Sequence, residues 1–102
     1  MEIICSDDRR GTRKWGADNW SCMKRRLSIL MAAPTLFDMG TLPGNCHELT
    51  LDRKGQFAVS LWGPYRLIFE PNHNPLPVLP DGGIDRTGVT KITIMEVVNY
   101  HD

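Results

Sequence analysis

The chain has 102 residues, of which 41% are hydrophobic, and its 12 basic and 12 acidic side chains give a formal net charge of zero. This length suffices for one domain with one modest core, and the composition excludes a disordered chain. No apolar run is long enough to span a bilayer and the start does not resemble a signal peptide, so we expect a cytoplasmic protein. Three dispersed cysteines argue against a disulfide framework or a zinc site.

The charge is unevenly distributed along the chain. Residues 1–26 carry seven basic and four acidic side chains, whereas residues 27–102 carry five basic and eight acidic ones. A nucleic-acid binder usually has a net basic surface, because neutralising phosphates supplies much of its affinity. Any contact with RNA must therefore be local, or another particle must contribute to binding.

The first third of the chain has helical patterns. Residues 2–15 predict a short helix ended by Gly16, although Ile3 and Ile4 would also fit a brief edge strand. Asp18 can cap a second helix. Its apolar residues recur at spacings of three and four, which places them on one helix face: Trp20, Met23, Leu27, Leu30 and Met31. Pro34 ends this helix or opens a short turn as far as Met39.

Strand patterns follow. Strands are expected at residues 46–51, 56–61, 65–70 and 91–99, with a hairpin turn at residues 52–55. In the third of these, Tyr65, Leu67 and Phe69 share the apolar face, and Arg66 lies on the opposite face. Residues 70–90 are rich in proline and glycine, and such a long loop in a compact domain is often functional. The layout predicts an α+β fold, with two N-terminal helices on one face of a mainly antiparallel sheet of three to four strands.

Several side chains can support proton transfer or bind a phosphate. His47 and His101 are candidate acid–base groups, and Tyr100 can orient a substrate or donate a proton. Arg66 can hold a phosphate in bidentate fashion; the alternative is a salt bridge with one of three carboxylates, Glu48, Glu70 or Glu96. The alternative for each histidine is an ordinary surface or capping residue.

The remaining candidates are basic residues and one loop histidine. Arg53 and Lys54 lie in the predicted hairpin turn, and Lys24, Arg25 and Arg26 form the densest positive run of the chain. Each of these sets also fits a solvated surface. We interpret His73 as a loop residue and the cysteines as small, partly buried hydrophobic residues.

Four segments in this order resemble the RelE/HigB-like toxins of bacterial type II toxin–antitoxin systems, also called plasmid maintenance killer proteins. They are LPGNCHEL (42–49), DRKGQF (52–57), GPYRLIFEP (63–71) and EVVNYH (96–101). The resemblance covers residues 17–102, and it implies one RelE/ParE-like toxin domain over residues 1–102. It also implies that an N-terminal strand and part of the first helix are missing.

The resemblance further implies a ribosome-dependent mRNA endoribonuclease. In this family a 2′-hydroxyl attacks the adjacent phosphate without a metal or other cofactor. The implied catalytic residues are His47, Arg66, Tyr100 and His101, and the RNA-binding candidates are Arg53, Lys54, Lys24, Arg25 and Arg26. The implied partners are the ribosome, mRNA and a cognate HigA-like helix-turn-helix antitoxin, through which alone the toxin would contact DNA.

Two alternatives remain open at this point. The family commonly has a cation where this chain has Thr50, so Lys54 would have to replace it or activity would fall. A ParE-like toxin of the same fold, which inhibits gyrase by protein contact, needs no nuclease site. A degenerate relative that binds only an antitoxin is the other alternative.

Overall fold

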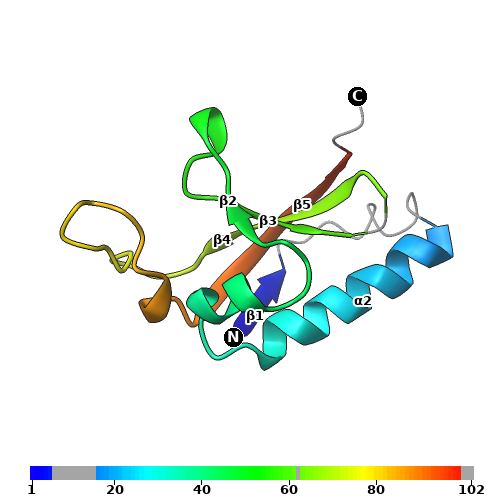
Figure 1. Cartoon of the computed structure of the whole chain (residues 1–102), viewed down its shortest axis with the longest axis horizontal. Helices are drawn as coiled ribbons and strands as arrows, with labels where there is room; N and C mark the ends of the chain where they lie inside the picture. Colours follow the sequence, from blue (N-terminus) through cyan, green and yellow to red (C-terminus); the bar gives the residue numbers. More distant parts are fainter. Residues whose placement is uncertain (6–15, 62, 100–102) are drawn as a thin grey trace.

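A computed structural model describes residues 1–5, 16–61 and 63–99 of the chain. Its strands (β), α-helix (α) and 3-10 turns (η) follow in the order β1 (Glu2–Cys5), α2 (Gly16–Ala32), η1 (Leu36–Thr41), β2 (His47–Glu48), η2 (Leu51–Arg53), β3 (Phe57–Ser60), β4 (Tyr65–Pro71), η3 (Arg86–Gly88) and β5 (Lys91–Asn99). The fold is α+β, as predicted, and α2 runs along one side of the sheet (Figure 1).

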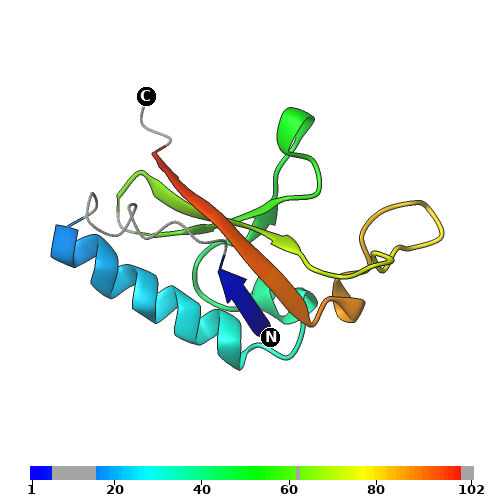
Figure 2. The same cartoon turned by 180° about the vertical axis from the view of Figure 1, so that it is seen from behind.

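The five strands form one mixed sheet in the order β1-β5-β4-β3-β2. Strands β2 to β5 pair antiparallel, whereas β1 pairs parallel to β5, with Ile3 opposite Ile92 (Figure 2). The prediction of three to four strands was therefore wrong, and so was the prediction that the first strand is missing. Residues 2–5 are too few to reveal a strand by alternation, and it is the pairing with β5 that makes them one.

Helix α2 is the one α-helix among the described residues. Of the predicted first helix, residues 2–5 form β1 instead, and residues 6–15 lie outside the described residues. The C-terminal end of α2 is capped from a distant position. The Met1 ammonium donates to the carbonyl oxygens of Leu30 at 3.0 Å, Met31 at 2.9 Å and Ala33. These carbonyls lack partners within the helix, and a positive charge is favourable beside them.

The core lies between the sheet and the layer formed by α2 and η1. Its buried residues are Met23 and Leu30 from α2, Leu36 and Met39 from η1, Phe57, Val59, Leu67, Phe69 and Ile92 from the sheet, and Ala33, Leu61 and Val89 from the connections. Phe57 and Phe69 stack with ring centroids 5.8 Å apart. The predicted helix face is confirmed for Met23 and Leu30 but wrong for Met31, which is 65% exposed because it lies about 100° around the helix from Leu30.

The strand bounds explain how the outer elements differ from the prediction. Strands β3, β4 and β5 fall where alternation or β-branched residues predicted them, and β5 has the predicted bounds. Strand β2 has only two residues instead of the predicted six, because residues after Glu48 leave the sheet. The predicted hairpin turn is longer than expected and contains η2.

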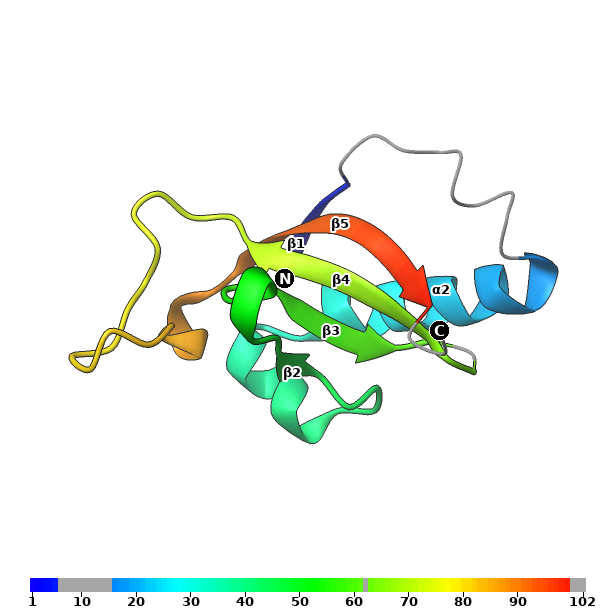
Figure 3. The ribbon, with the colours of Figure 1, turned by 90° about the horizontal axis from the view of Figure 1, so that it is seen from above.

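The long loop between β4 and β5 has internal structure. Val78 and Ile84 form a β-bridge, and the backbone N–H of Leu79 donates to the carbonyl oxygen of Gly83 at 2.7 Å. A Cβ at Gly88 would come within 2.9 Å of Pro77, so only glycine allows this close approach. In Figure 3 the loop projects beyond one end of the sheet.

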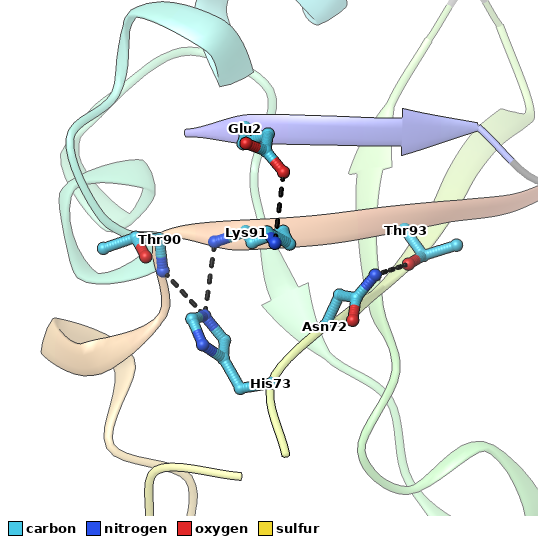
Figure 4. Close-up of polar contacts among 6 residues, drawn as sticks. All are labelled: Glu2, Asn72, His73, Thr90, Lys91 and Thr93. Atoms are coloured by element: carbon cyan, nitrogen blue, oxygen red, sulfur yellow. Dashed lines mark hydrogen bonds and ion pairs between the residues drawn. The ribbon is translucent and has the colours of Figure 1, made fainter. Parts of the chain in front are cut away.

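His73 fastens the base of this loop to β5 (Figure 4). Its Nε2 accepts hydrogen bonds from the backbone N–H groups of Thr90 at 3.1 Å and Lys91 at 3.3 Å. Beside it, Asn72 donates from its side chain to the Thr93 hydroxyl at 3.0 Å. His73 is thus a loop residue, as interpreted from the sequence, and it has a defined structural role.

Candidate functional site

The strand register defines a second sheet surface, which we call the outer face, opposite the side covered by α2. One cross-strand row on it consists of His47, Ala58, Ile68 and Glu96, and the next consists of Ser60, Arg66 and Val98. Directly paired residues share a face, and neighbours along a strand alternate. The prediction that Arg66 lies opposite Leu67 and the core is therefore confirmed.

Arg66 is directed along β4 towards the turn between β3 and β4. Its Nη1 donates to the carbonyl oxygens of Gly63 at 3.0 Å and Tyr65 at 2.9 Å. Within the described part of the chain it forms no ion pair, so the alternative of a salt bridge with Glu48, Glu70 or Glu96 was wrong there. These two bonds fix the side chain and leave Nε and Nη2 to receive a ligand.

His47 lies exposed on the short edge strand β2. Its Nδ1 is 3.0 Å from the carbonyl oxygen of Asn45. A carbonyl oxygen only accepts, so Nδ1 carries the hydrogen in this bond and Nε2 of the neutral ring has a lone pair. Nε2 is therefore the ring nitrogen that can accept a proton from a substrate.

His47 and Arg66 share the outer face without touching. They are separated by two strand spacings and two residues along the strands, which corresponds to roughly 12 Å between Cα atoms. A ligand would therefore have to lie between them to contact both side chains. The other two predicted catalytic residues, Tyr100 and His101, lie outside the described residues. Strand β5 ends just before them at Asn99, which pairs with Tyr65.

Residues 49–56, which connect β2 to β3 and contain η2, stand on the outer face, and we call them the finger. In Figure 1 the finger (green) projects from the upper side of the sheet, and α2 runs along the lower side. Arg53 of the finger donates from Nη2 to Glu96 on β5 and from Nη1 to Gln56 at 3.0 Å. Lys54 and Thr50 are exposed. Glu96 was weighed from the sequence only as a partner for Arg66; its pairing with Arg53 depends on the finger folding back, which no local pattern reveals.

The basic run on α2 divides into residues of different character. Lys24 and Arg25 are exposed, whereas Arg26 is partly buried and donates from Nε to the carbonyl oxygen of Ser60 at 2.7 Å. Arg26 therefore fastens α2 to the end of β3. Its predicted contact with RNA would have to use its remaining nitrogens.

A further polar cluster at the β2 edge was not anticipated. Arg86 of η3 lies over the ring of Phe57, 5.1 Å from its centroid, and 3.9 Å from the carboxylate of Glu48. Burial raises the pKa of the nearby Cys46 thiol to about 11, against the opposing effect of the Arg86 charge. Cys46 is therefore a protonated thiol at neutral pH and not a nucleophile.

Two general properties bear on what this surface can do. In residues 1–5, 16–61 and 63–99, no three His, Cys, Asp or Glu side chains gather closely enough to hold a metal ion. No described helix has both the length and the apolar content needed to cross a membrane. The outer face offers one imidazole, His47, and two guanidinium groups, Arg53 and Arg66, which can transfer a proton and stabilise a phosphate.

Comparison with known proteins gives one informative similarity. No family model and no curated protein matches the chain. Among solved structures, a YoeB/ParE toxin from Agrobacterium tumefaciens matches with a TM-score of 0.62 and 10% sequence identity, covering 99% of this chain and 100% of that one. At such low identity the match concerns the fold, and it includes β1 and the long loop. The chain therefore has the fold of the YoeB/ParE toxin.

Proposed function

We propose that the chain is the toxin of a type II toxin–antitoxin module and cleaves mRNA on the ribosome. The main support is the match to the YoeB/ParE toxin over 99% of the chain, together with the position of His47 and Arg66 on one sheet face. The proposal treats residues 1–102 as one cytoplasmic toxin domain that needs no cofactor and is neutralised by a HigA-like helix-turn-helix antitoxin.

In this mechanism the 2′-hydroxyl of a nucleotide attacks the adjacent phosphorus. Nε2 of His47 removes the hydroxyl proton, Arg66 stabilises the negative charge that develops on the phosphoryl oxygens, and His101 protonates the leaving 5′-oxygen, with Tyr100 orienting the scissile phosphate. The reaction requires positioning and charge stabilisation more than a strong nucleophile. Arg53 and Lys54 of the finger would contact the RNA backbone, and Lys24, Arg25 and Arg26 would contact RNA or the ribosome on the other side.

The test is induction of the full chain in bacteria without an antitoxin, with growth and mRNA 5′ ends followed together. We expect growth arrest and new ends within translated codons. Arg66→Ala and His101→Ala should relieve both effects in folded protein, whereas Lys91→Ala, a basic residue at the opposite end of β5, should remain toxic. Full toxicity of Arg66→Ala and His101→Ala would refute the site, and normal growth at high wild-type expression would refute the function.

A second candidate is a ParE-like gyrase inhibitor without nuclease activity. It is favoured by the engagement of Arg53 and Arg26 in intramolecular bonds and by Thr50 in place of a cation. Inhibited DNA supercoiling with intact mRNA would support it. A chain that binds an antitoxin but produces neither effect would be the degenerate relative.

A further inference from the structure

The ion pair between Arg53 and Glu96 crosses the outer face from the finger to β5. Glu96 pairs in register with Ile68, and Ile68 pairs with Ala58. Arg53, which lies beyond β3 in the finger, therefore reaches over β4 to contact Glu96. The two side chains are 40% and 45% exposed, so solvent reaches the pair from outside.

The sheet residues beneath this ion pair are apolar and inaccessible to solvent. Ala58 and Ile68 are fully buried although they lie on the face away from α2 and outside the main core cluster. The finger and its arginine are therefore packed onto the sheet here. An ionic contact over an apolar floor is less screened than one surrounded by water.

Both terminal nitrogens of Arg53 are committed to neighbours. Nη2 donates to the carboxylate of Glu96 and Nη1 donates to the side-chain oxygen of Gln56. A guanidinium recognises a phosphate through the same paired N–H groups that bind a carboxylate. Two of the five N–H donors of Arg53 are thus engaged, and a phosphate that approaches this guanidinium competes with the carboxylate of Glu96 for it.

We propose that Glu96 is an internal counter-ion that competes with the RNA backbone for Arg53 and thereby sets the affinity of the outer face for a phosphodiester. Glu96 is a positioning residue and takes no part in proton transfer. In the resting protein it holds the finger against β5; a bound phosphate takes its place on Arg53, and the carboxylate turns to solvent. This inference rests on the proposed function only in placing RNA on the outer face.

The inference is tested with the full chain and a 2′-O-methyl oligoribonucleotide, which lacks the nucleophilic hydroxyl and cannot be cleaved. Glu96→Gln keeps the side-chain shape and removes the charge. We expect about fivefold tighter binding, the size that corresponds to one exposed ion pair. The slope of log affinity against log salt should steepen by about 0.7, which is the value for one additional phosphate contact to a single strand.

The matched control is Glu70→Gln. Glu70 lies on β4, paired with Thr93, and its side chain is on the outer face, as that of Glu96 is. It forms no ion pair in the described residues. The substitution Glu70→Gln removes the same charge without releasing Arg53. The affinity for the oligoribonucleotide should therefore change less than about twofold, and the slope of log affinity against log salt should not change. In an Arg53→Ala background the effect of Glu96→Gln should disappear, because the two residues act as a pair.

Three results would overturn the inference: equal effects of Glu96→Gln and Glu70→Gln, an effect that survives Arg53→Ala, or no binding of the probe by either wild type or Glu96→Gln at low salt. If Glu96→Gln does not fold, Glu96→Ala removes the same carboxylate from a half-exposed strand position, and the same tightening is expected, again abolished by Arg53→Ala. Tightening by Glu96→Gln without mRNA cleavage would refute the nuclease proposal alone, and cleavage without tightening would refute this inference alone.

Discussion

The side chain of Arg26 donates from Nε to the carbonyl oxygen of Ser60 at 2.7 Å and so joins α2 to the end of β3. The N–H of Ser60 in turn donates to the carbonyl oxygen of Gly44, also at 2.7 Å. Gly44 has a φ of 121°, and a Cβ there would lie 3.4 Å from Nε of Arg26. One residue of the basic run is therefore part of the structural frame of the protein.

Replacing Arg26 should consequently lower stability. Arg26→Ala leaves the Ser60 carbonyl without its charged donor, and we expect a loss of about 1–2 kcal/mol in the free energy of unfolding. Arg25→Ala, on the exposed neighbour, should change it by less than about 0.5 kcal/mol. Urea denaturation followed by circular dichroism measures both. Equal stabilities of the two variants would show that the Arg26 bond contributes nothing.

The anchor at His73 gives a second prediction. His73→Ala removes the acceptor for the N–H groups of Thr90 and Lys91, so these amides should exchange with solvent faster and stability should fall by about 1–2 kcal/mol. Asn72→Ala removes only an exposed side-chain bond to Thr93 and should cost less than about 0.5 kcal/mol. Native-state hydrogen exchange resolves the two amides directly. If the Thr90 and Lys91 amides exchange at the same rate in His73→Ala as in wild type, the loop is positioned by its own contacts and not by His73.

The orientation of residues inside alternating strands could be predicted from the sequence. The positions of residues that depend on contacts far along the chain could not. Alternation around Arg66 gave its face correctly, because Leu67 and Phe69 must be buried together. The strand at Ile3 was missed as a definite element, since only pairing with β5 stabilises so short a segment. The partner of Arg53 was missed for the same reason: 43 residues separate it from Glu96.

Leu51 at the tip of the finger offers a test of local backbone strain. It has a φ of 57°, which L residues with large side chains avoid, and its side chain is 90% exposed. Leu51→Gly should therefore relieve about 1 kcal/mol of strain with little loss of packing, partly offset by the greater freedom of glycine in the unfolded chain. We expect an unchanged or higher melting temperature. A clear decrease would show that Leu51 packs in solution. Thr50→Gly, at an extended position beside it, is the control and should only destabilise.

The partly buried thiol of Cys46 predicts a specific dependence on alkaline pH. Its pKa is raised from 9.0 to about 11 in the folded protein, chiefly by desolvation. Below pH 9 the thiol is protonated in both states and does not affect the pH dependence. Between pH 9 and 11 the unfolded chain releases this proton first, so stability should fall by up to about 1.4 kcal/mol per pH unit on account of Cys46.

Cys46→Ala removes this contribution, so its melting temperature should fall less steeply than that of wild type between pH 9 and 11, although the variant starts from a lower value because it loses buried volume. Alkylation provides an independent measurement. At pH 8 the thiolate fraction of Cys46 should be about 100-fold smaller in the folded than in the urea-unfolded protein. Peptide mapping after brief iodoacetamide treatment reports the difference, and rapid modification of Cys46 in the folded protein would contradict its burial.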